Sequence, residues 1–61
     1  MSITINNHRV TIGDVAGTMH PYFTPGYRPA WIDGEYIGEF PSEESAIDTA
    51  TMILRATGVL Q

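Results

Sequence analysis

The 61-residue sequence contains no cysteine, which excludes disulfide bonds, thiolate zinc sites and a cysteine nucleophile. It also contains no lysine, so three arginines stand against seven acidic residues and the formal net charge is −4. Ordinary nucleic-acid binding and adsorption to an anionic membrane both need a clustered basic surface. We therefore expect neither a direct nucleic-acid partner nor a membrane partner.

Long apolar runs are also absent, and the first residues have neither the basic region nor the apolar core of a signal peptide. We expect a cytoplasmic protein, which would act in the host cytoplasm if it is phage-encoded. The 43% hydrophobic and 10% aromatic content is too high for a disordered tail. The sequence therefore predicts one folded domain over residues 1–61.

Recognisable catalytic motifs are missing too. There is no Ser-His-Asp arrangement, no glycine-rich phosphate loop and no nucleophile elbow. His8, His20 and Asp14 have no metal-ligand spacing, and a chain this short encloses little volume in which to bind a substrate. We expect no enzymatic activity, no metal and no cofactor.

Alternating apolar and polar residues predict four strands in two hairpins. Residues 2–12 alternate around Asn6-Asn7, and residues 30–40 alternate around Asp33-Gly34; both pairs suit tight hairpin turns. The segment 13–29 carries three prolines and three glycines, which predicts a long loop, with room for a short helical turn at 14–16.

A helix is expected to follow the second hairpin. Ser42 suits the N-cap, acidic residues occupy the first turn, and Gly58 should end the helix at Thr57. One apolar stripe runs along it: Ala46, Ile47, Ala50, Ile53 and Leu54. The predicted class is α+β, a small antiparallel β-β-loop-β-β sheet with one C-terminal amphipathic helix packed on it.

A two-residue loop at Asp33-Gly34 places Ile32 opposite Glu35 and Trp31 opposite Tyr36. We expect the aromatic side of this hairpin to form the core: Trp31, Tyr36 and Phe40. The outward side would then combine apolar and acidic residues: Ile32, Glu35, Ile37 and Glu39. A register slip of one residue would exchange the two faces.

Acidic residues cluster in the second half of the chain, where Pro29 to Leu54 contains no basic residue. Together with Ile37, six of them form the first part of the candidate partner-binding surface: Asp33, Glu35, Glu39, Glu43, Glu44 and Asp48. The negative electrostatic potential of these clustered carboxylates indicates a basic protein partner. The proline-stiffened loop adds three aromatic candidates, Tyr22, Phe23 and Tyr27, which either bind the partner or fold back to seal the small core.

Residues Trp31 to Ala50, with Tyr36-Ile37-Gly38-Glu39-Phe40 and an acidic helix start, resemble the closing hairpin and helix of the three-stranded-sheet DNA-binding domains of AP2 factors and integrase arm-binding regions. That resemblance implies a DNA-binding or recombination accessory module, with phosphate contacts from Arg9 and Arg28. In overall character the short, acidic, cysteine-free chain resembles small phage-encoded inhibitors of the anti-CRISPR kind. This second resemblance implies an inhibitor that covers a nucleic-acid-binding protein surface. A phage structural subunit is a third interpretation, and the oligomeric state stays open.

Overall fold

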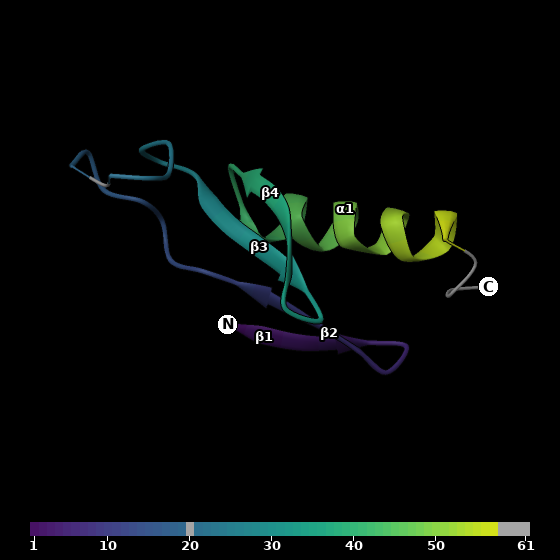
Figure 1. Ribbon diagram of the computed structural model, residues 1–61. Helices are drawn as coiled ribbons and strands as arrows, with labels where there is room; N and C mark the ends of the chain where they lie inside the picture. The colour runs from purple at the N-terminus through teal and green to yellow at the C-terminus, as the bar shows by residue number, and fades with distance from the viewer. Residues whose placement is uncertain (20, 58–61) are drawn as a thin grey trace.

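The computed structural model describes residues 1–19 and 21–57, which form one four-stranded antiparallel sheet and a C-terminal helix. In chain order the elements are β1 (Ser2–Ile5), β2 (His8–Ile12), β3 (Arg28–Ile32), β4 (Glu35–Phe40) and α1 (Glu43–Ala56). The strands lie in the sheet in sequence order, and α1 runs along one side of it (Figure 1). The predicted α+β class is confirmed. His20 and Gly58 lie outside the described residues.

Both hairpins turn through two residues in the left-handed region. The φ angles are 49° and 69° at Asn6 and Asn7, and 51° and 84° at Asp33 and Gly34. Asn-Asn and Asp-Gly tolerate these angles, and the mirror-image turns that they form match the twist of the flanking strands. The predicted register of the second hairpin is confirmed up to Tyr36, which lies opposite Trp31.

Strand β4 then loses strict alternation at a β-bulge. Trp31 pairs with Tyr36, but the next pair is Ala30 with Gly38, so Ile37 is an extra residue in β4. Gly38 adopts a φ of 135°, which few other residues tolerate. Beyond the bulge every side chain changes face, and the predictions that Phe40 shares the face of Tyr36 and that Glu39 shares that of Glu35 are both wrong.

The core lies between α1 and a mainly aliphatic face of the sheet; of the three aromatic residues expected in the core, Phe40 packs against it, whereas Trp31 and Tyr36 lie outside it. Its buried centre consists of Val10, Ile12, Ala30, Ala46 and Ala50. Ile32 and Ile37 pack against this centre, so the prediction that they point outward is wrong. The reason is the pairing of the two hairpins, because Val10 lies opposite Ile32 and paired residues share a face.

Helix α1 begins and ends where the sequence predicts. The Ser42 hydroxyl accepts a hydrogen bond of 3.1 Å from the Ser45 backbone N–H, and Thr57 is the C-cap. Three residues of the predicted stripe are buried against the sheet: Ala46, Ala50 and Leu54. Two of these are alanines, whose small side chains let a helix approach a sheet closely.

The segment between β2 and β3 projects beyond the end of the sheet (Figure 1). Two backbone hydrogen bonds close its base, since the Ala16 N–H donates to Tyr27 O (2.8 Å) and the Gly26 N–H donates to Ala16 O (2.9 Å). No helical turn forms at residues 14–16, where the Ala16 backbone bonds to Tyr27 and Gly26 instead. The described part of the chain contains no helix with the length and apolarity needed to span a bilayer.

Candidate protein-binding surface

The six clustered carboxylates lie in two groups rather than on one face. Asp33 and Glu35 are at the β3–β4 turn, whereas Glu39 lies near the other end of β4, four residues and about 13 Å away at 3.3 Å per residue. The remaining three follow in the first turns of α1: Glu43, Glu44 and Asp48. The fold therefore divides the predicted acidic surface along the length of β4.

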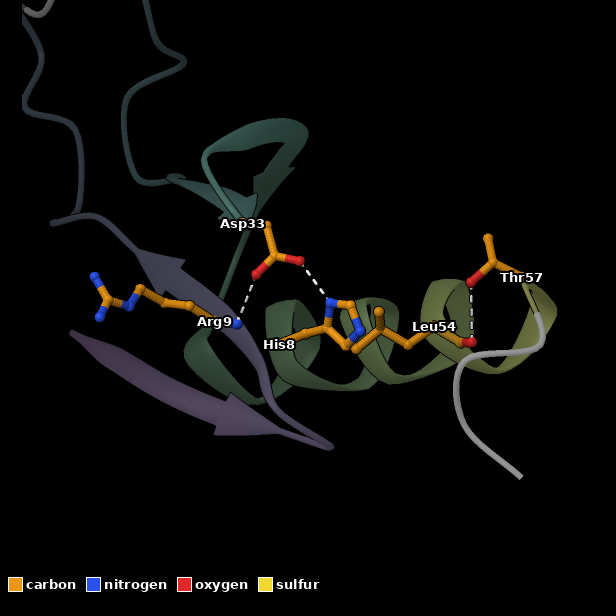
Figure 2. A network of polar contacts seen from close by, with 5 residues as sticks. All are labelled: His8, Arg9, Asp33, Leu54 and Thr57. Atoms are coloured by element: carbon orange, nitrogen blue, oxygen red, sulfur yellow. Dashed lines mark hydrogen bonds and ion pairs between the residues drawn. The ribbon is translucent and has the colours of Figure 1, made fainter.

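Asp33 joins the two hairpins to each other (Figure 2). One carboxylate oxygen lies 2.5 Å from His8 Nδ1, and the other accepts a 2.9 Å hydrogen bond from the Arg9 backbone N–H. The His8 hydrogen bond first, and then the Arg9 backbone hydrogen bond, lower the pKa of Asp33 below its ordinary value of 3.8. This carboxylate is therefore ionised at neutral pH and is engaged within the molecule.

Two further carboxylates also hold the fold together. Glu39 accepts hydrogen bonds from the Thr24 backbone N–H (2.6 Å) and hydroxyl (3.2 Å), which ties the projecting loop to β4. Glu43 forms a 3.0 Å ion pair with Arg28, which ties the start of β3 to α1. The Arg28 Nε is buried and has no hydrogen-bond partner within the described residues, so Arg28 depends on Glu43.

The other three carboxylates are exposed: Glu35, Glu44 and Asp48. Over residues 1–19 and 21–57, none of them forms a hydrogen bond or an ion pair with another side chain. The bonds that fix Asp33, Glu39 and Glu43 thus separate the predicted acidic set into three structural carboxylates and three that face solvent. Within the first group only Glu43 is paired with an arginine, whereas the partners of Asp33 and Glu39 are a histidine ring, backbone N–H groups and a hydroxyl.

The aromatic residues divide in the same way. Tyr22 is 86% exposed and Tyr27 is 40% exposed, so both present aromatic surface to solvent. Phe23 is half-buried, and its ring lies 6.2 Å from the ring of Tyr36. Phe23 thus covers part of the sheet on the face away from α1, and it does not seal the core.

This open face of the sheet carries an aromatic row that sequence reasoning assigned to the core. The Trp31 and Tyr36 rings lie 6.0 Å apart and continue the contact of Phe23 with Tyr36. Across the sheet, Trp31 lies opposite Thr11. The polar alternation of Arg9 and Thr11 in β2 is the signal that could have identified this face as the solvent side.

The described residues enclose no pocket and bring together no group of three or more His, Asp or Glu side chains able to hold a metal ion. No protein-family model, curated protein or solved structure matches the sequence. The candidate site is therefore a surface, defined by the exposed carboxylates and by the aromatic residues of the loop and open face.

Proposed function

We propose that this chain is a non-catalytic, protein-binding inhibitor that covers a basic surface of its target. That surface would be one that otherwise binds nucleic acid, as in the host-defence complexes blocked by anti-CRISPR proteins. The observation that carries the proposal is the set of exposed carboxylates at Glu35, Glu44 and Asp48, in a stretch with no basic residue from Pro29 to Leu54. These carboxylates, at the β3–β4 turn and in the first turns of α1, attract a basic partner and raise the association rate.

Tyr22 would supply the apolar part of the contact. Charge complementarity acts mainly on association and specificity, whereas a buried aromatic side chain slows dissociation. Tyr22 is the most exposed aromatic of the loop, and the Glu39 bonds to Thr24 hold the backbone close to it. A tyrosine presented on a held loop loses little conformational entropy when a partner covers it.

The first test is binding of the chain to purified CRISPR effector complexes at increasing salt, with and without their target DNA. We expect affinity to fall as salt screens the charges, and we expect bound DNA to compete. The triple variant Glu35→Lys/Glu44→Lys/Asp48→Lys should abolish binding. Asp14→Lys, at an exposed carboxylate outside the acidic stretch, is the single-site charge control. Salt-independent binding would contradict the electrostatic part of the proposal.

The second test separates binding from folding. Tyr22→Ala should weaken binding by about 2 kcal/mol or more, as is typical of an interface hot spot, and should speed dissociation. Phe23→Ala should instead lower the melting temperature, because Phe23 contacts Tyr36. If Tyr22→Ala leaves the dissociation rate unchanged, the contact lies elsewhere.

A DNA-binding module is the second candidate, favoured by exposed Arg9 on the same open face as Trp31. The register supports this placement, since Thr11 pairs with Trp31 and Arg9 is two residues away on β2. Arg28, the other arginine that this function would need, is held by Glu43. A gel shift of the chain alone with duplex and single-stranded DNA at low salt distinguishes the candidates, because retardation would favour this second function.

A further inference from the structure

We infer that the chain associates with a second copy of itself through the free edge of β1, forming a continuous eight-stranded sheet across a two-fold axis. Among residues 1–19 and 21–57, strand β1 pairs on one side only, with β2. Its other side is therefore a row of backbone groups able to pair with another strand. The inference is independent of the proposed function.

The register of β1 on β2 determines which backbone groups face outward. Met1 and Ile12 exchange both of their backbone hydrogen bonds, at 2.8 Å and 2.7 Å. In an antiparallel ladder such pairs alternate, so Ile3 and Ile5 also direct their backbone groups toward β2. Ser2 and Thr4 consequently direct theirs away from the sheet, to the free edge.

A second β1 fits this edge in one register that uses all of these groups. When Ile3 lies opposite Ile3 of the second copy, Ser2 lies opposite Thr4 and Thr4 opposite Ser2, so each pair exchanges two hydrogen bonds. The same register places Ile5 opposite Met1, which is 51% exposed. The apolar residues of both strands then meet on the α1 side of the sheet, where Ile3 and Ile5 are only half-buried.

The charge distribution favours a second copy at this edge. Residues 1–7 contain no charged side chain, although the whole chain carries a net charge of −4. Two copies therefore meet at β1 with little side-chain repulsion. The edge also has no proline, lysine or bulge to block pairing, whereas the opposite edge, β4, contains the Gly38 bulge and Glu35.

Sedimentation equilibrium of the unmodified full-length chain over a range of concentrations tests the inference. We expect the mass to rise from 6.7 kDa to twice that value. Thr4→Pro removes the outward N–H without removing a bond to β2 and should keep the chain monomeric. Thr4→Val keeps that N–H and should still form the dimer. A monomer at every concentration, as expected if β1 pairs only with a strand of another protein, would overturn the inference, as would a folded Thr4→Pro dimer.

Cross-linking tests the register, and its result does not depend on whether Thr4→Pro folds. Because the chain has no cysteine, Ile3→Cys introduces a single thiol. In the proposed register this thiol faces the same thiol of the second copy, at a distance suited to a disulfide. Under mild oxidation, Ile3→Cys should form covalent dimer at least about tenfold faster than the exposed loop variant Thr18→Cys, because pairing raises the effective concentration. Equal rates, or a faster Thr4→Cys, would contradict the Ile3-centred pairing.

Discussion

Asp33 performs two tasks at the tip of the second hairpin. Its backbone adopts the positive φ that the turn requires. Its carboxylate forms hydrogen bonds with the His8 ring and with the Arg9 backbone N–H. The turn alone would accept asparagine equally well. What the carboxylate adds is the connection between the β3–β4 turn and the start of β2.

This connection should make stability depend on pH. The pKa of Asp33 is lower in the folded chain than its ordinary value of 3.8, so the ionised carboxylate stabilises the fold fully above that value. The stabilisation is lost as the pH falls through the lower folded pKa. In thermal melts from pH 6 to 2, Asp33→Asn should therefore lose less stability on acidification than the unmodified chain.

Asp14→Asn is the matched control for that experiment, since Asp14 is exposed and outside the Asp33 network. It should retain the acid-induced loss of stability seen in the unmodified chain. If Asp33→Asn and the unmodified chain lose the same stability on acidification, the His8 and Arg9 contacts do not stabilise the fold.

Arg28 and Glu43 give a second prediction at this scale. Because Arg28 is the less exposed partner, at 24%, removal of the Glu43 charge leaves a partly buried guanidinium unpaired. Glu43→Gln should lower the free energy of unfolding by about 1 kcal/mol, as measured by urea denaturation. The neighbouring exposed residue Glu44 is the control. Glu44→Gln should change the free energy of unfolding by less than about 0.5 kcal/mol. Equal effects would show that the ion pair contributes nothing.

Among the elements, strand β4 shows where sequence reasoning succeeds and where it fails. The two hairpin turns and the helix start are local features, so Asn6-Asn7, Asp33-Gly34 and Ser42 predict them. The core face is a non-local feature, because it depends on which residue of β2 lies opposite Ile32. The bulge is also hidden, since an isolated glycine in a strand is compatible with regular pairing as well as with a bulge.

The same reasoning explains the partial prediction of the candidate site. The acidic stretch and the exposed Tyr22 follow from composition and loop chemistry. The engagement of Glu39 by Thr24 could not be predicted, because only the bulge turns Glu39 toward the loop. Residue types alone do not distinguish a carboxylate that holds the fold from one that faces solvent.

The bulge itself can be tested at Gly38. A side chain there would meet only the Phe40 ring at ordinary contact distance, so the cost of substitution comes from the φ of 135°. Gly38→Ala should lower the free energy of unfolding by about 1–3 kcal/mol, as measured by urea denaturation. Gly17→Ala, in open space without a positive φ, should change it by less than about 0.5 kcal/mol. A neutral Gly38→Ala would show that β4 adopts another register.

In the whole molecule, the helix and the projecting loop are arranged along one axis. The principal extents are 40 × 15 × 15 Å, so a small core supports a comparatively long surface. The faces differ in character: α1 carries exposed carboxylates, the opposite sheet face carries the aromatic row, and the β1 edge has no charged side chain. An elongated shape of this kind allows one short chain to contact a target and a second copy at separate places.

The order of the strands also has a kinetic consequence. Each hairpin closes over two residues, and hairpins form in about 1–10 μs. Joining them requires closure of the segment 13–27, and this step brings β2 and β3 together. The entropy of closure rises slowly with length, by about 0.6 kcal/mol per doubling. A glycine-serine insertion after Gly17 is therefore expected to slow folding modestly while the unfolding rate stays nearly constant, because the closed loop is already present when unfolding begins.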